Sequence, residues 1–130
     1  MTKILIADDE LDMRELMELV LRFAGFEVVL VADGFEALEK APLEQPDLIL
    51  LDVLMPEMTG YEVLRRLREN PATSAIPVVL FSAKGREAEI KQGLELGAVE
   101  YIVKPFAPDD LTSQVKDVLR RCELGIYEED

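Results

Sequence analysis

The stretch "DLILLDVLMPEMTG", residues 47–60, places a carboxylate directly after an unbroken apolar run and follows it four residues later with a proline. A short run of Leu and Ile bounded by turn residues is typical of a strand that is buried on both faces. Asp52 therefore stands where a buried strand ends, and Pro56 stands in the loop that follows it. An acid in that place is either a helix cap or a functional group, and the rest of the chain decides between the two.

Short apolar runs of the same kind recur along the chain, and the segments between them have the apolar period of helices. The runs that we expect to form strands are 3–7, 27–32, 47–52, 76–82 and 100–104. The helices expected in the middle of the chain span 34–41, 59–69 and 86–96. With a first and a last helix, strand and helix alternate five times. This alternation predicts an α/β fold: a doubly wound, five-stranded parallel sheet of order 2-1-3-4-5, flanked by five helices.

The first expected helix carries two apolar sets. The set spaced i, i+3, i+4 and i+7 consists of Leu16, Leu19, Val20 and Phe23, and we expect it to face the core. The second set, beside the first, consists of Met13, Met17 and Leu21. Two interpretations of the second set remain open: it widens the core stripe, or it is a docking surface for a helical bundle.

Length and charge limit the classes of function. At 130 residues the chain fits one domain, which we expect over residues 1–124, followed by a short acidic tail over 125–130. The chain carries 27 Asp and Glu against 14 Lys and Arg, which gives a net charge of −13. Such a surface repels phosphodiester backbones and anionic membranes, so we expect neither direct nucleic-acid binding nor membrane association.

The chain has no histidine and a single cysteine, Cys122. These counts exclude an internal disulfide, a Ser-His-Asp or Cys-His nucleophile and a histidine-ligated zinc site. The first residues, MTKILIADDE, lack a basic leader, and no apolar run approaches the roughly 20 residues of a membrane helix. We therefore expect a cytoplasmic location.

Polar side chains gather where the expected strands end. Asp8 and Asp9 follow the first strand, Asp52 ends the third, Ser82 ends the fourth and Lys104 ends the fifth. The carboxyl ends of parallel strands share one edge of the sheet, and open α/β sheets bind their ligands at that edge. Because the first and third strands are neighbours in the predicted order, the three carboxylates converge and require a cation among them. Oxygen ligands without Cys or His select a hard ion, and a few carboxylates with waters suit Mg²⁺ or Mn²⁺ better than a Ca²⁺ site built wholly from protein ligands.

Each of these residues also has a simpler interpretation. Any one of the acids, taken alone, is better explained as a helix cap. Ser82 taken alone is a turn residue, and Lys104 is a solvated charge. The shared position favours a functional site, because the acids, the hydroxyl and the amine all fall at the carboxyl ends of strands. In such a site Lys104 pairs with a carboxylate or a phosphoryl group, and the Ser82 hydroxyl donates to the same group.

Five segments, in their order and at their intervals, resemble the receiver domain of bacterial two-component response regulators. They are ILIADDE, ADGFEAL, PDLILLDVLMPEMTGYEVLRRLR, IPVVLFSA and GAVEYIVKPF, and the resemblance covers essentially the whole chain. It implies the flavodoxin-like receiver fold. It also implies that Asp52 is the phosphoacceptor, and that Asp8, Asp9 and the backbone carbonyl of Leu54 join Asp52 as ligands of Mg²⁺.

The same resemblance implies how the domain works. A sensor histidine kinase or a phosphotransfer protein donates the phosphoryl group, and Asp52 accepts it while Lys104 neutralises the phosphoryl oxygens. Ser82 and Tyr101 are the switch residues that respond to the phosphoryl group, and Lys104 precedes a cis Pro105. The domain is then not an enzyme in the ordinary sense, although it assists its own phosphorylation and dephosphorylation.

Signalling output is implied on the face built from the fourth helix, the fifth strand and the fifth helix. A downstream protein target binds there to the form that phosphorylation favours. Some family members dimerise on this face through a set of charges, part of which is supplied here by Glu100 with Arg121 and Lys91 with Asp110. Gln114 stands where that set has an arginine, so we expect a monomer or a weak dimer.

Other functions fit the residues less well. A haloacid-dehalogenase-like phosphatase needs a second acid two residues after its nucleophile, where this chain has Leu54. A flavodoxin-like electron carrier needs a phosphate-binding loop after the first strand, where the anionic DDELD would repel phosphate. A degenerate receiver, which binds partners without phosphorylation, remains the alternative. Both a stand-alone receiver and the front part of a longer regulator are consistent with the chain.

Overall fold

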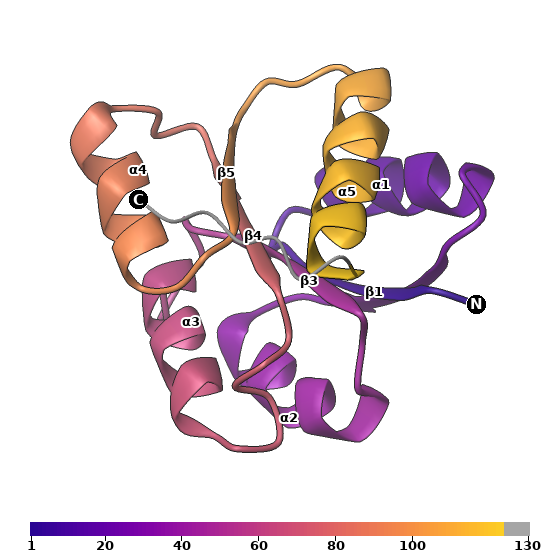
Figure 1. The fold of residues 1–130 in the computed structure, drawn as a ribbon. Helices are drawn as coiled ribbons and strands as arrows, with labels where there is room; N and C mark the ends of the chain where they lie inside the picture. Colours follow the sequence, from indigo (N-terminus) through magenta and orange to yellow (C-terminus); the bar gives the residue numbers. More distant parts are fainter. Residues whose placement is uncertain (124–130) are drawn as a thin grey trace.

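The computed structural model describes residues 1–123, which form three layers, with a parallel sheet between two layers of helices (Figure 1). The strands are β1 (Lys3–Ala7), β2 (Glu27–Val31), β3 (Leu48–Asp52), β4 (Val78–Ser82) and β5 (Glu100–Val103). The helices are α1 (Leu11–Phe23), α2 (Gly34–Glu44), α3 (Gly60–Glu69), α4 (Glu87–Glu95) and α5 (Pro108–Glu123). The sheet order is β2-β1-β3-β4-β5 and every neighbouring pair is parallel. The predicted fold class and strand order are therefore confirmed, whereas the predicted tail over 125–130 lies outside the described residues.

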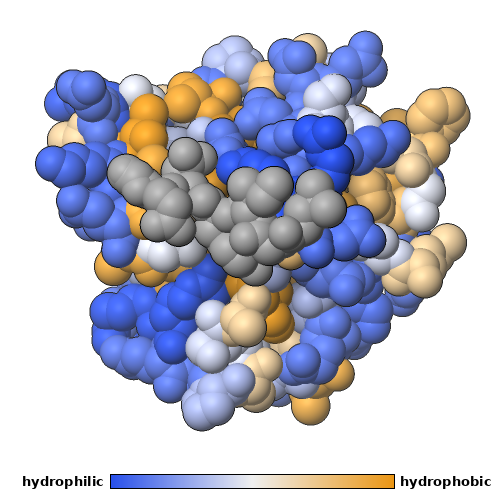
Figure 2. Space-filling view, in the orientation of Figure 1, coloured by the Kyte–Doolittle hydropathy of each residue, from blue (hydrophilic) through white to orange (hydrophobic). Residues whose placement is uncertain are grey.

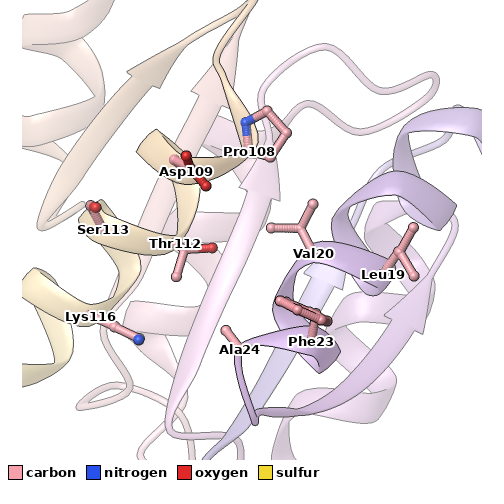
Figure 3. Close-up of a pocket in the computed structure, with 9 residues that line it drawn as sticks. All are labelled: Leu19, Val20, Phe23, Ala24, Pro108, Asp109, Thr112, Ser113 and Lys116. Atoms are coloured by element: carbon pink, nitrogen blue, oxygen red, sulfur yellow. The ribbon is translucent and has the colours of Figure 1, made fainter.

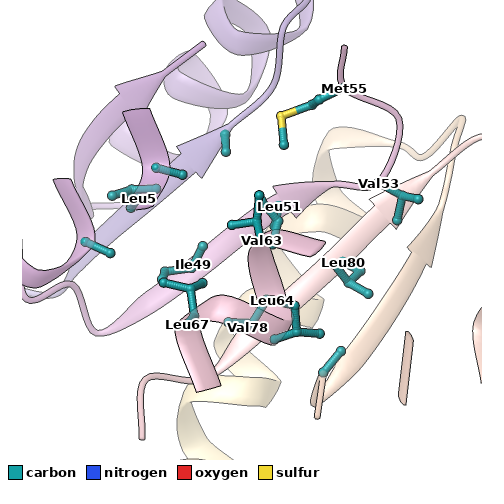
Figure 4. Close-up of a cluster of buried hydrophobic side chains, with 14 of the residues drawn as sticks. Leu5, Ile49, Leu51, Val53, Met55, Val63, Leu64, Leu67, Val78 and Leu80 are labelled. Carbon is teal, nitrogen blue, oxygen red and sulfur yellow. The ribbon is translucent and has the colours of Figure 1, made fainter. Parts of the chain in front are cut away.

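Side chains that alternate along each strand form two separate cores, one on each face of the sheet. The core in Figure 4 lies between the sheet and α2, α3 and α4, and it includes Leu5, Ile49, Leu51, Leu80, Val63, Leu64 and Leu67. The core on the other face packs against α1 and α5, and it includes Ile4, Ile6, Leu50, Phe81, Leu111 and Val115. Because helices cover both faces, the strands are apolar at nearly every position, as parallel strands are expected to be.

Helix α1 buries a different face from the one predicted. Met17 and Leu21 are fully buried, and Met13 packs beside them. Of the four residues predicted to face the core, only Val20 packs against it, and Leu16, Leu19 and Phe23 are 44%, 68% and 93% exposed. The prediction was wrong because both apolar sets have helical spacing, and the direction in which α1 leaves β1 decides which set meets the sheet. The second set is therefore part of the core.

The surface of the molecule is mainly hydrophilic. On the face of the molecule that Figure 2 shows, hydrophilic residues cover most of the surface and apolar residues appear between them. Within residues 1–123, every helix is too short or too polar to cross a membrane.

Candidate functional site

The register of the sheet brings the polar residues at the strand ends to one edge. Asp8 follows a residue of β1 that is paired with the residue before Asp52, so the two acids leave neighbouring strands at the same level. Ser82 lies one step beyond the β4 partner of Asp52, and Lys104 lies one step beyond the β5 partner of Ser82. The structure therefore brings the predicted site residues together at the carboxyl ends of β1, β3, β4 and β5.

The ammonium group of Lys104 lies between the two buried acids. Its Nζ is 3.6 Å from Oδ2 of Asp8 and 3.6 Å from Oδ2 of Asp52. Glu10, which the sequence did not single out as a site residue, adds an exposed carboxylate 3.7 Å from the same nitrogen. The centroid of the Phe81 ring lies 4.9 Å away. Asp8 and Asp52 are 0% and 2% exposed, so the ammonium group of a single, partly buried lysine serves two buried carboxylates.

Burial makes ionisation of the two acids costly. Burial first, and then the Asp8 carboxylate, raise the pKa of Asp52 to about 7, although Lys104 and the Leu54 N–H act in the opposite direction. Burial also raises the pKa of Asp8, against the effect of the Glu10 N–H and of Lys104. A further cation beside these carboxylates would favour the ionised form of both.

The acids fit the requirements of a metal site. One carboxylate oxygen from each of Asp8, Asp9 and Asp52 lies within 4.8 Å of the other two. Oδ1 of Asp8 accepts a hydrogen bond from the Glu10 N–H at 2.8 Å. Oδ2 of Asp8 is buried and has no hydrogen-bond partner within residues 1–123. A hard divalent cation among these oxygens would satisfy that atom, because buried polar atoms are costly to leave without a partner.

The loop after Asp52 folds back onto the end of β3. The Leu54 N–H donates to Oδ1 of Asp52 at 3.1 Å, and the Gly60 N–H donates to the Val53 carbonyl at 2.9 Å. A Cβ atom at Gly60 would overlap the Asp52 carbonyl oxygen and would lie 2.8 Å from Cα of Val53. Helix α3 therefore begins in contact with the backbone at the end of β3, and only glycine leaves room for this approach.

Ser82 and Tyr101 are linked through the backbone of Lys84, a contact that the sequence pattern does not reveal. Tyr101 is 8% exposed, and its hydroxyl donates to the Lys84 carbonyl at 2.7 Å. The Lys84 N–H donates to Oγ of Ser82 at 3.0 Å. The two residues that the family resemblance identifies as switch residues therefore hold the same loop between β4 and α4. The Lys104–Pro105 peptide bond is cis, as that resemblance implied.

The acids open into a small hollow. Its volume is about 320 Å³, and it is lined by Asp9, Glu10, Asp52, Leu54, Ala83 and Lys104. A larger groove of about 760 Å³ lies between α1 and α5, and it is lined by Leu19, Val20 and Phe23 on one side and by Thr112 and Lys116 on the other (Figure 3). None of the predicted site residues lines this groove. The smaller hollow is the candidate site, because the buried charges converge on it.

One of the charge pairs expected on the output face forms within the chain. The guanidinium of Arg121 in α5 donates to Oε1 of Glu100 in β5 at 2.9 Å, and it also pairs with Asp117 of its own helix. These contacts join α5 to β5 on the α4–β5–α5 face. Arg121 therefore has partners in the isolated chain before any contact with a second molecule.

Comparison with known proteins identifies a family with the same fold. The family model described as "Response regulator receiver domain" matches residues 4–116. Chemotaxis protein CheY4 of Vibrio cholerae superposes with a TM-score of 0.86 at 35% identity, over 91% of this chain and 98% of that chain. A putative response regulator from Chloroflexus aurantiacus superposes with a TM-score of 0.87 at 40% identity, over 92% of this chain and 98% of that chain.

Curated relatives are longer than this chain. The probable transcriptional regulator ycf27 of Cyanophora paradoxa is 46% identical over 121 residues, which are 93% of this chain and 49% of that protein. The alkaline phosphatase synthesis transcriptional regulatory protein PhoP of Bacillus subtilis is 43% identical over 123 residues, which are 95% of this chain and 50% of that protein. The chain thus spans about half the length of the curated relatives it matches.

Proposed function

Because the chain belongs to the response regulator receiver domain family, we propose that it accepts a phosphoryl group on Asp52 and signals through the change of shape that follows. The observation that carries this proposal is the pair of buried carboxylates, Asp8 and Asp52, that shares the Lys104 ammonium group at an open edge of the sheet. Burial of two carboxylates beside one ammonium group lowers the stability of the fold. The arrangement instead suits a site that receives an anionic group together with a cation.

Each residue at this edge of the sheet has its own role in phosphoryl transfer. An oxygen of Asp52 attacks the phosphorus of a phosphohistidine on a sensor kinase or phosphotransfer protein; the P–N bond breaks and its electron pair stays on the imidazole nitrogen. Lys104 lies close enough to Asp52 to neutralise the incoming phosphoryl oxygens. Asp8 and Asp9, with Asp52 and the backbone carbonyl of Leu54, would hold Mg²⁺, which neutralises charge on the phosphoryl group when bound. The rigid strand ends keep these groups in place.

The site also supports hydrolysis of its own product. The hollow is open beside Asp9 and Leu54, so water can reach a phosphoryl group on Asp52. The same charges that assist phosphorylation then assist the attack of water on phosphorus. In this proposal the chain is a signalling domain that takes part in its own phosphorylation and dephosphorylation.

The output follows from the loop that Ser82 and Tyr101 hold. A phosphoryl group on Asp52 offers new acceptor oxygens to the Ser82 hydroxyl. If Ser82 moves toward them, the position of the Lys84 backbone changes, and the Tyr101 hydroxyl is hydrogen-bonded to that backbone. The α4–β5–α5 face then changes shape, and a downstream protein binds one of its two forms. We propose protein contacts rather than direct nucleic-acid contacts for this chain, because its net charge is −13.

The extent of the domain is part of the proposal. The family match over residues 4–116 supports a receiver domain over residues 1–124, and α5, described over Pro108–Glu123, lies within it. The expected cytoplasmic location and the expected monomer or weak dimer also remain part of it.

The test is the intact mass of the protein after incubation with acetyl phosphate, with and without Mg²⁺. We expect a gain of about 80 Da, the mass of one phosphoryl group, that requires Mg²⁺ and is absent in Asp52→Asn. Asp47→Asn is the matched control, because Asp47 is an exposed acid that directly precedes β3, at the end opposite Asp52, and its substitution should leave the adduct unchanged. A wild-type protein that stays unmodified while it binds Mg²⁺ would favour the degenerate receiver instead.

A further inference from the structure

We propose that the hydroxyl of Tyr61 is a positioning group of the switch: it fixes α4 to α3 and thereby favours the form in which Tyr101 is turned inward. This inference rests on the proposed function of Asp52 as phosphoacceptor. It concerns a residue of α3 to which the family resemblance assigned no role, and it explains how the strand that carries Asp52 is coupled to α4.

Tyr101 depends on the position of α4. Its ring is 8% exposed, beneath α4, and its hydroxyl is bonded to the Lys84 carbonyl just before that helix. A Cβ atom at Gly93, in α4, would lie 2.6 Å from Cδ1 of Leu80 and 3.1 Å from Cδ2 of Tyr101. The helix backbone therefore rests directly on the Tyr101 ring. A shift of α4 and a rotation of Tyr101 are consequently expected to occur together.

Helix α4 has few apolar contacts that could fix it. It spans Glu87–Glu95, and Gly93 is its one buried residue. Ile90 packs against the core only in part. A segment with so little buried apolar surface opens or shifts at low cost, so a hydrogen bond to its backbone has a large relative effect.

Tyr61 supplies such a bond. Its hydroxyl donates to the Glu89 carbonyl in the first half of α4, at 3.1 Å. Burial and the neighbouring Tyr101 side chain both raise the pKa of Tyr61, so the group stays protonated and remains a donor at physiological pH. Both tyrosine side chains thus hold backbone carbonyls of the same segment, Tyr101 just before α4 and Tyr61 within it.

Tyr61 also has a fixed base from which to act. It follows Gly60, whose backbone lies against Asp52 and Val53 at the end of β3. The position of the start of α3 is therefore fixed by the end of β3. Tyr61 links this position to α4 through its hydrogen bond to the Glu89 carbonyl. Through this path, the strand that carries the phosphoacceptor is joined to the output face by a single side chain.

The variant that isolates the hydroxyl is Tyr61→Phe, which keeps the ring and removes the bond to Glu89. Mg²⁺ with beryllofluoride, a mimic of the phosphoryl group on Asp52, serves as the probe, and amide NMR signals of Gly85 and Gly93 report on the segment. We expect Tyr61→Phe to weaken beryllofluoride binding about three- to tenfold. Loss of the Tyr61 hydrogen bond makes the form with Tyr101 turned inward less favourable, and the affinity for a ligand that prefers this form falls by the same factor. The affinity for Mg²⁺ alone should stay unchanged, and hydrogen exchange of α4 amides in the metal-free protein should become faster.

Thr73→Val is the control for a loss of stability without a change in the switch. Thr73 is a buried residue beyond the far end of α3, and its hydroxyl donates to the Leu67 carbonyl at 2.7 Å. This variant should lower the melting temperature and leave beryllofluoride binding as in the wild type. Wild-type affinity in Tyr61→Phe, or unchanged exchange in its α4, would overturn the inference. A wild-type protein that fails to bind beryllofluoride would overturn the proposed function, and the inference with it.

Discussion

Asp52 combines deep burial with a charge that its surroundings only partly offset. It lies beside the equally buried Asp8, and Lys104 is shared between the two carboxylates. The folded domain is therefore more stable when one of these acids is protonated or when a further cation is present. This property ties the stability of the domain to pH and to metal.

A first prediction concerns the pH dependence of stability. The folded-state pKa of Asp52 is raised from 3.8 to about 7, so between these values the folded protein holds a proton that the unfolded chain has released. The free energy of unfolding of the metal-free protein should therefore fall as the pH rises through this range. Asp52→Asn cannot ionise at this position, so its melting temperature should exceed that of the wild type by a few degrees at pH 8 and by less at pH 5.

Thermal unfolding of both proteins at the two pH values, without and with Mg²⁺, checks this prediction. Mg²⁺ should raise the melting temperature of the wild type at pH 8 more than that of Asp52→Asn, because the variant has lost one anionic ligand. Equal differences between the two proteins at pH 5 and pH 8 would show that Asp52 does not carry the raised pKa.

At the scale of the element, the start of α3 is the contact that fixes the acceptor. Gly60 allows the helix to begin against the backbone of Asp52 and Val53, where a side chain has no room. The clash in a Gly60 variant involves backbone atoms, which move only if β3 or α3 moves.

Gly60→Ala should therefore lower both stability and function. We expect a loss of about 1–3 kcal/mol in the free energy of unfolding and a slower phosphorylation by acetyl phosphate, because the end of β3 is displaced. Gly25→Ala is the matched control: Gly25 has φ +98° and nothing within 4 Å of an added Cβ, so its substitution strains the backbone far from the acids. Denaturant unfolding and phosphorylation rates distinguish the two, and a Gly60→Ala protein that is phosphorylated as fast as Gly25→Ala would contradict this role of α3.

The elements also show what the sequence could and could not predict. The strands were predictable because helices cover both faces of the sheet, which makes runs such as LILL, residues 48–51, apolar throughout. The buried face of α1 was not predictable, because the set with Leu19 and the set with Met17 have the same helical spacing. Only tertiary packing decides which of the two sets is buried. The bond from Tyr61 to Glu89 joins residues 28 positions apart, and no local pattern encodes it.

At the scale of the molecule, the parallel order of the strands creates the site. Side chains from residues 8, 52 and 104 meet because their strands all end at the same edge, with β1 and β3 adjacent, and residue 82 ends its strand at that edge too. This convergence follows from the alternation of strands and helices, so the sequence was sufficient to predict it. Two features depend on side-chain positions that only the structure gives. Oδ2 of Asp8 has no hydrogen-bond partner within residues 1–123, and Lys104 is shared between Asp8 and Asp52.

The most direct test of this architecture is the position of the phosphoryl group in the chain. The protein is incubated with acetyl phosphate and Mg²⁺, the acyl phosphate is reduced with borohydride, and the modified residue is located by tandem mass spectrometry of the peptides. Reduction of an aspartyl phosphate leaves homoserine, so the register of the sheet predicts homoserine in place of Asp52 and unchanged aspartate at positions 8 and 9. Homoserine in place of Asp8 or Asp9, with Asp52 unmodified, would contradict the assignment of Asp52 as the phosphoacceptor.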